Sequence, residues 1–133
     1  MSMIHCRIVT PHGVYKEMET PIINIDTNDG QRGILPNHMP LVTMLKIGRM
    51  ETEEKGTRQE YAVAGGLFYF RDNTAEILTD AIENKNEIDF ERAQSAKQRA
   101  EERIASNNPN YDLQRARIAL QKAINRMNVK GIR

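Results

Sequence analysis

The sequence has no tryptophan and a single cysteine, and these absences exclude several classes of protein. Because Cys6 stands alone, no internal disulfide can form, which fits a reducing compartment. No apolar run approaches the roughly 18 residues that a membrane-spanning helix needs. The N-terminus lacks a charged region followed by a long apolar stretch, so we expect no signal peptide. We therefore expect no direct insertion into a membrane.

The familiar catalytic and metal-binding motifs are missing as well. The sequence contains no G-x-x-x-x-G-K-[ST] phosphate loop, no G-x-G-x-x-G and no G-x-S-x-G. His5, His12 and His38 do not have metal-ligand spacing. His38 has two readings, a catalytic base or a histidine that orders its loop or an interface, and the second is favoured. The pattern predicts a non-catalytic interaction protein rather than an enzyme.

Charge is distributed unevenly along the 133 residues, a length that allows one or two small domains. From Glu87 onward, ten Lys/Arg stand against six Asp/Glu, whereas the first 86 residues hold nine against twelve. The basic excess therefore belongs to the C-terminal part alone. Aromatic residues are not interleaved with its cations, and acidic residues interrupt them, so we expect no nucleic-acid binding.

Up to about Asp80 the apolar residues recur with period two, the pattern of β-strands. Turn sequences such as "PHG" and "NDG" separate short stretches that are rich in β-branched and aromatic residues. Many short strands at this spacing predict an antiparallel sandwich or barrel. The pair Gly65-Gly66 interrupts one strand and predicts a bulge or a close backbone approach. The stretch "GILPNHMP" is predicted as an ordered loop, because Pro36 and Pro40 cannot donate to a strand ladder.

The C-terminal part has helical composition instead. Ile88–Ser106 contains no Pro or Gly and is dominated by Ala, Arg, Glu, Gln and Lys. "SNNPN" ends this segment, and a second helix is predicted over about Tyr111–Asn128. The sequence thus predicts an α+β protein: residues 1–86 form an N-terminal antiparallel β-sandwich, and residues 87–133 form a C-terminal two-helix antiparallel hairpin.

The two helices begin with nearly the same phrase, "IDFERA" and "YDLQRA". Asp89 and Asp112 fall where a helix begins, so each side chain is predicted to cap its helix and to interact favourably with the helix dipole. Alanines follow at spacings of three and four, which predicts a narrow seam where the helices pack closely. Packing alone leaves apolar residues of the second helix unexplained: Leu113, Leu120, Ile124 and Met127.

Long stretches of the chain resemble the epsilon subunit of the bacterial F-type ATP synthase. The resemblance rests on "NDGQRGILPNHMPLVTMLKIG", on "YAVAGGLFYFRDNTAEILTDA" and on the two-helix tail, in the family's order and over essentially the whole chain. It implies a ten-stranded β-sandwich followed by a helical hairpin. It also implies a central-stalk rotor subunit that couples ring rotation to the catalytic head and makes no covalent bonds itself.

The same resemblance implies partners and a location. The sandwich is expected to bind the gamma subunit and to rest on the c-ring, with the loop Gln31–His38 touching the ring. Gln31 stands where relatives often carry Glu. The complex is expected on the cytoplasmic face of the cell membrane, where this chain is a peripheral component.

In some family members the hairpin binds ATP as a regulatory ligand, through an Ile/Leu-Asp-x-x-Arg-Ala motif and cations on both helices. No cofactor is otherwise required. Lys122 occupies a place where strong ATP binders of the family carry Arg, and lysine lacks the planar fork of arginine. The competing interpretation is that Arg92 and Arg99 are solvated surface charges. The implied nucleotide-binding residues are Glu83, Ile88, Asp89, Arg92, Ala93, Arg99, Lys122 and Arg126.

The resemblance further implies that the hairpin inhibits ATP hydrolysis by extending into the catalytic head. Its basic second helix would meet acidic segments of the alpha and beta subunits. A rival reading is a free-standing ATP-sensing interaction protein unconnected to the synthase. A third reading, an enzyme, is disfavoured by the missing motifs. The expected inhibitory contacts are Arg115, Arg117, Lys122, Arg126 and Lys130.

Overall fold

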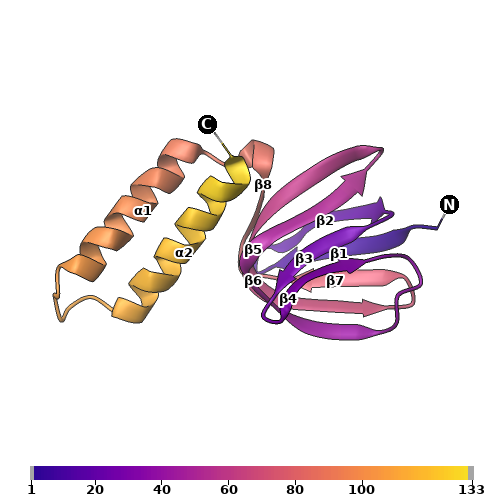
Figure 1. Cartoon of the computed structure of the whole chain (residues 1–133), viewed down its shortest axis with the longest axis horizontal. Helices are drawn as coiled ribbons and strands as arrows, with labels where there is room; N and C mark the ends of the chain where they lie inside the picture. Colours follow the sequence, from indigo (N-terminus) through magenta and orange to yellow (C-terminus); the bar gives the residue numbers. More distant parts are fainter. Residues whose placement is uncertain (1, 132–133) are drawn as a thin grey trace. The chain divides into compact units, whose positions relative to one another are not determined.

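The computed structural model describes residues 2–131 and divides the chain into two compact units, Met1–Asn84 and Lys85–Arg133 (Figure 1). The first unit contains the strands and the second contains the helices. The predicted α+β class, a sandwich followed by a two-helix hairpin, is confirmed. Arg133, which contributes to the basic excess of the tail, lies outside the described residues.

The strands of the first unit form one continuously hydrogen-bonded sheet in the order β2-β1-β7-β6-β5-β3-β4, with β8 paired to β6. Every pair is antiparallel except β1 with β7, which is parallel. The strands are β1 (Ile4–Thr10), β2 (Gly13–Thr20), β3 (Ile23–Thr27), β4 (Gly30–Ile34), β5 (Leu41–Glu54), β6 (Thr57–Arg71), β7 (Thr74–Leu78) and β8 (Ile82–Asn84).

The core of the sandwich follows the predicted alternation. In β1, Ile4, Cys6 and Ile8 are fully buried and the residues between them are more exposed. Strands β6 and β7 contribute Phe68 and Ile77, which are paired across the two strands and are both fully buried. Side chains of one parity therefore fill the interior, and side chains of the other parity lie on the outer face of the sheet.

A half-buried network of polar side chains borders the core of the sandwich. The Lys16 ammonium lies 2.6 Å from a Glu54 carboxylate oxygen, and the Tyr61 hydroxyl donates to the other oxygen at 2.6 Å. Burial alone would raise the pKa of Glu54, but hydrogen bonds from Lys16 and Tyr61 outweigh it and leave that pKa lowered. Burial and the nearby Glu54 carboxylate raise the pKa of Cys6 to about 12, so this thiol stays protonated in the core.

The expectation of ten strands is wrong for the described residues, which contain eight, because two strands are long and bent. Opposite β5, the partners of β3 shift from Ile25–Met50 to Thr27–Leu45, so β5 carries extra residues there. Asp26 fills this bulge and accepts a hydrogen bond from the Arg49 amide at 2.9 Å. Strand β5 has 14 residues and strand β6 has 15. Each is therefore long enough to contribute to two parts of the sandwich.

The predicted irregularity at Gly65-Gly66 is confirmed. Both residues have positive φ, +80° and +128°, a region that side chains with a Cβ rarely enter. A Cβ on Gly66 would lie 2.0 Å from the Leu78 carbonyl oxygen, which is too close for any real contact. Only glycine lets β6 pass so near the end of β7.

We expect Gly66→Ala to destabilise the sandwich by about 2–6 kcal/mol, since it adds backbone strain to a steric clash. Gly13→Ala is the matched control, because Gly13 also has positive φ (+111°) but has nothing within 4 Å of its Cβ position. It should cost only the strain, about 1–3 kcal/mol. Urea unfolding of both variants measures the difference, and equal losses would contradict the close approach.

The second unit contains a short 3₁₀ turn η1 (Lys85–Glu87), helix α1 (Phe90–Ala105) and helix α2 (Leu113–Lys130). Both helices begin two residues later than predicted, because the capping aspartate remains outside the helix. The Asp89 carboxylate accepts from the Arg92 amide at 3.1 Å, and the Asp112 carboxylate accepts from the Arg115 amide at 3.1 Å. Both predicted caps are confirmed, and α2 ends at Lys130 with Gly131 as its C-terminal cap in the left-handed conformation.

The small-residue seam is confirmed at four alanines, whereas Ala96 is half-buried and Ala119 is exposed. Ala93 and Ala100 on α1 are buried, as are Ala116 and Ala123 on α2. The two alanines of each helix are seven residues apart, which is about two helical turns. They therefore lie on one face of their own helix, and this face packs against the other helix. Between them the chain turns through Ser106–Asn110, and Asn107 has positive φ (+54°).

Candidate functional site

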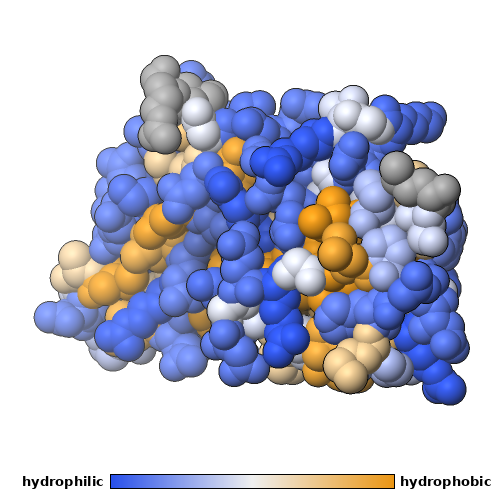
Figure 2. All heavy atoms as spheres, turned by 45° about the vertical axis from the view of Figure 1, so that its right-hand side comes forward, coloured by the Kyte–Doolittle hydropathy of each residue, from blue (hydrophilic) through white to orange (hydrophobic). Residues whose placement is uncertain are grey.

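The outer face of the sheet carries a row of apolar residues where a solvent-facing surface would ordinarily be polar. The register pairs Met44 with Leu67, Leu67 with Leu78, Leu78 with Val9, and Val9 with Val14. Met44, Val14 and Leu78 are 55%, 48% and 40% exposed. We call these five residues the apolar band. It crosses β5, β6, β7, β1 and β2 without interruption, and Figure 2 shows apolar patches at the surface among hydrophilic side chains.

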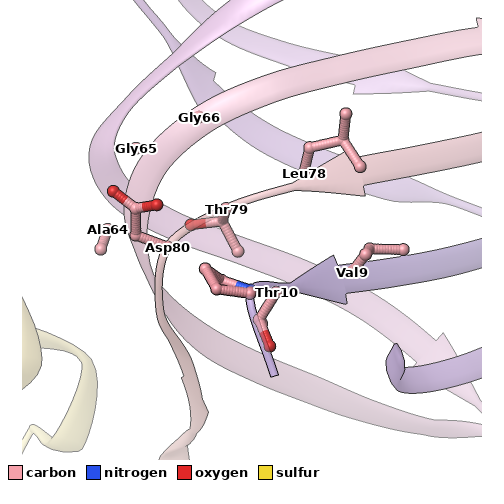
Figure 3. Close-up of a pocket in the computed structure, with 9 residues that line it drawn as sticks. Val9, Thr10, Ala64, Gly65, Gly66, Leu78, Thr79 and Asp80 are labelled. Carbon is pink, nitrogen blue, oxygen red and sulfur yellow. The ribbon is translucent and has the colours of Figure 1, made fainter. Parts of the chain in front are cut away.

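A hollow of about 290 Å³ lies beside the middle of the band, where β6 bends (Figure 3). Val9 and Leu78 of the band line it, and the bare backbone of Gly65 and Gly66 forms another part of its wall. The Thr79 amide donates to the Val9 carbonyl at 3.1 Å, which fixes the two strands beneath the hollow. The glycines that allow the close approach thus also leave this part of the wall without side chains.

Charged side chains flank the band on the same face. Arg7 lies 3.8 Å from Glu76, which is paired with the exposed Tyr69 on the next strand. His5 lies between Glu19 and Glu17, and hydrogen bonds to these two carboxylates raise its pKa. An apolar centre with a polar or charged rim is the usual arrangement of a protein–protein interface, and the apolar band with its flanking charges has this arrangement.

The loop between β4 and β5 presents two large apolar side chains, Leu35 at 56% and Met39 at 72% exposure. Asn37 and Asn73 hold the loop in place: the Asn37 amide donates to Asn73 Oδ1 at 2.5 Å, and Asn73 Nδ2 donates to Asn37 Oδ1 at 2.9 Å. His38 Nδ1 lies 2.7 Å from the Met39 carbonyl oxygen. The ring of His38 also packs edge-on against Phe70. These contacts favour the loop-ordering role of His38 over a catalytic one.

Gln31 and His38, the two residues predicted to touch the c-ring, are placed differently. Gln31 is exposed on strand β4, where it pairs with Asp26, so the predicted loop begins later than expected. Gly33 and Ile34 also belong to β4, and Leu35–Pro40 alone forms the loop. His38 is part of that loop and is half-buried.

Three side chains of the motif at the start of α1, those of Ile88, Asp89 and Ala93, have a structural role. Ile88 is 3% exposed, and Asp89 caps the helix. The amide of Arg92 receives the cap, while its side chain is exposed. Ala93 lies in the seam between the helices. This geometry confirms the packing interpretation of "IDFERA", and the nucleotide interpretation remains a prediction.

The other predicted nucleotide-binding residues are spread along the hairpin and beyond it. Arg99 is exposed on α1. A helix rises about 1.5 Å per residue, so Arg99 lies roughly 10 Å further along the helix axis than Arg92. Lys122 and Arg126 are half-buried on α2, whose C-terminal half lies beside the start of α1 in the antiparallel hairpin (Figure 1). Glu83 lies on β8 in the other unit.

The predicted inhibitory residues fall into two groups. Arg115 and Arg117 are exposed in the first turns of α2. Lys122, Arg126 and Lys130 are half-buried, and the Lys130 ammonium donates to the Lys85 carbonyl at 3.1 Å. Among these five residues, only Arg115 and Arg117 are classed as exposed in this conformation of the hairpin.

Some candidate functional residues were not found from the sequence. The apolar band was missed because its members are far apart in the chain and meet only through the strand order. Arg103 and Tyr111 were missed too, although Arg103 lies 5.5 Å from the centroid of the Tyr111 ring and lines a hollow with Arg99 and Arg115.

Among residues 2–131, no group of His, Cys, Asp and Glu is arranged to hold a metal ion. No helix within the same range has the length and apolar character needed to cross a bilayer.

The fold defines a two-domain protein, in which a β-sandwich with an exposed apolar band is followed by a compact helical hairpin. Residues 3–85 match the family model "ATP synthase, Delta/Epsilon chain, beta-sandwich domain", and residues 86–131 match "ATP synthase, Delta/Epsilon chain, long alpha-helix domain". The chain belongs to the ATP synthase delta/epsilon chain family.

The similar curated proteins are named ATP synthase epsilon chains. The ATP synthase epsilon chain of Bacillus pumilus is 39% identical over 132 residues, covering 98% of this chain and 99% of the relative. That of Pediococcus pentosaceus is 41% identical over 132 residues, covering 96% and 95%. The resemblance to epsilon chains found in the sequence is therefore confirmed.

Solved structures agree. A chain in the Euglena gracilis mitochondrial ATP synthase structure of OSCP, F1 and c-ring matches with a TM-score of 0.77 and 26% identity, covering 91% of this chain and 77% of that one. A chain in the Tetrahymena thermophila central stalk and c-ring structure shares the fold, with a TM-score of 0.59 and 18% identity over 97% and 94%.

Proposed function

We propose that this chain is a non-catalytic subunit of the central stalk of an F-type ATP synthase, docked through the outer face of its sandwich. The apolar band carries the proposal, because five paired strands present aliphatic side chains to solvent beside a hollow and a charged rim. Exposed apolar surfaces of this kind commonly mark sites where another protein binds. The gamma subunit is the proposed partner, as the resemblance implies.

The loop Leu35–Pro40 is the proposed contact with the c-ring. Its exposed Leu35 and Met39 supply apolar contact area, while the Asn37–Asn73 hydrogen bonds hold their positions. His38 fixes the loop backbone, and Gln31 offers a polar group on the preceding strand. With this contact the subunit would be a peripheral component at the cytoplasmic face of the membrane, as the resemblance implies.

The hairpin is the proposed regulatory element, and ATP is its proposed ligand. Arg92, Lys122 and Arg126 bring positive charge to the open end of the hairpin, and Arg99 extends it along α1. A bound phosphate chain would relieve the repulsion among these cations and hold the two helices together. Ile88, Asp89, Ala93 and Glu83 complete the proposed set.

The proposed inhibitory function uses the basic face of α2 against acidic segments of the alpha and beta subunits. We expect the double substitution Arg115→Glu and Arg117→Glu to raise ATP hydrolysis by the assembled enzyme roughly 2- to 10-fold, because exposed ion pairs contribute about 0.2–1 kcal/mol each. Lys55→Glu with Arg58→Glu makes the same change in charge on the sandwich and should leave hydrolysis unaltered. Unchanged hydrolysis in the Arg115/Arg117 variant, once its assembly is verified, would refute the electrostatic account.

The rival function, a free-standing ATP sensor, makes a different prediction about assembly. A free-standing sensor does not need the apolar band to bind a stalk subunit, so the chain would purify alone from cells that express the complete synthase. The stalk function requires that the chain purify with gamma in fixed proportion. Co-purification from detergent extracts therefore separates the two functions.

A further inference from the structure

The hollow beside the apolar band has walls of unequal chemistry. Val9 and Leu78 supply aliphatic surface, and Gly65 and Gly66 supply bare backbone. Of the nine residues that line the hollow, Asp80 alone has an ionisable side chain. Figure 3 shows this side chain on the Gly65 side of the hollow, across from Val9 and Leu78. The hollow therefore combines apolar walls with a single negative charge.

The uncharged polar side chains in the lining already have partners within the sandwich. The Thr10 hydroxyl donates to the Gly13 carbonyl at 3.3 Å, and the Thr79 hydroxyl donates to the Ala81 carbonyl at 3.1 Å. Asp80 is different: it is exposed, and within residues 2–131 its carboxylate takes part in no hydrogen bond or ion pair. A side chain that enters the hollow thus meets one polar side chain without a partner, and that side chain is an anion.

This combination favours one kind of incoming side chain. A purely aliphatic side chain would cover the apolar walls but would leave the Asp80 carboxylate without a partner. An acidic side chain would be repelled by the same carboxylate. Lysine and arginine have an aliphatic stem that packs on apolar surface and a cationic head that forms strong hydrogen bonds with carboxylates. The stem matches the walls of the hollow, and the head matches its charge.

We infer that this hollow receives one basic side chain, a lysine or an arginine, from the gamma subunit. The stem of that side chain lies against Val9 and Leu78, and its head pairs with Asp80. The inference rests on the proposed docking of gamma, because Val9 and Leu78 belong both to the apolar band and to the hollow. Apolar contacts are non-directional, so the charge pair fixes the register of gamma along the band.

Substitutions of Asp80 in the full chain test the inference, with binding to purified gamma measured by calorimetry and folding verified by circular dichroism. We expect Asp80→Asn to weaken binding about 5- to 50-fold, because it leaves a cation of gamma without its partner. Asp80→Glu keeps the charge and should stay within about threefold of the unmodified chain. Asp72→Asn is the matched control, since Asp72 is also exposed, follows β6 directly and does not line the hollow. It should change the affinity less than about twofold.

The dependence of the affinity on salt separates an ion pair from a structural effect. Added NaCl screens a charge pair at the edge of an interface, so the affinity of the unmodified chain should fall with salt and that of Asp80→Asn should fall less. If Leu78→Asp weakens binding and Asp80→Asn does not, gamma docks on the band without a basic side chain in the hollow, and the inference is overturned while the proposed function stands. If neither substitution weakens binding, both are overturned. Equal losses for Asp80→Asn and Asp80→Glu would also overturn the inference, because the charge would then not matter.

Discussion

Leu78→Asp is expected to weaken binding of this chain to the gamma subunit by at least thirtyfold. Leu78 is at the centre of the apolar band, is paired with Leu67 and Val9, and lines the adjoining hollow. A buried apolar anchor in an interface contributes about 2 kcal/mol or more, and a carboxylate there would also have to lose its water. Because Leu78 is 40% exposed in the isolated chain, the substitution should leave the sandwich folded.

Leu113→Asp provides the control for that experiment. Leu113 is 44% exposed, close to the value for Leu78, but it is in the first turn of α2, where an added carboxylate suits the helix dipole. Its affinity for gamma should stay within about twofold of the unmodified chain. Titration of the purified subunits by calorimetry gives both numbers, and circular dichroism verifies folding. Similar affinities for the two folded variants would mean that the band is not the docking surface.

The second large effect concerns ATP and the two similar caps. Asp89→Ala and Arg92→Ala should each weaken ATP binding about 10- to 100-fold, because each is expected to remove charged hydrogen bonds from the nucleotide site. Asp112→Ala should leave affinity nearly unchanged and cost roughly 0.5–2 kcal/mol of local helix stability. The two aspartates are a matched pair, since each caps its helix with the same 3.1 Å hydrogen bond.

This matching separates stability from recognition. If Asp89→Ala acts only through the cap, Asp112→Ala will have the same effect on ATP, and the losses will be equal. Titration of the three variants with ATP, with helicity followed by circular dichroism, measures both quantities. If the unmodified chain binds no ATP at millimolar concentration, the motif has only the packing role that the structure assigns to it.

Local chemistry made much of this fold predictable. The aspartate caps and the alanine seam depend on residues within a few turns of each other, so their spacing in the sequence is sufficient to predict them. The alternation in β1 predicts its buried Ile4, Cys6 and Ile8 for the same reason. Gly65-Gly66 predicted an irregular strand because glycine is required where φ is positive.

Features that depend on distant parts of the chain were not predictable in the same way. The parallel pairing of β1 with β7 joins segments at opposite ends of the sandwich sequence, and no local pattern specifies it. The apolar band depends on that pairing, because it connects Val9 to Leu78. The hollow between the two helices depends on the register of the hairpin, which brings Arg115 beside Arg99 and Arg103.

The most direct test of the central claim uses a chain that ends at Asn86, reconstituted with the other subunits of the synthase. This chain retains the whole first unit, Met1–Asn84, and lacks both helices. If the sandwich docks and the hairpin regulates, the shortened chain will purify with gamma in the same proportion as the full chain. The assembled enzyme will then hydrolyse ATP faster. Failure of the folded, shortened chain to bind gamma would contradict this division of roles.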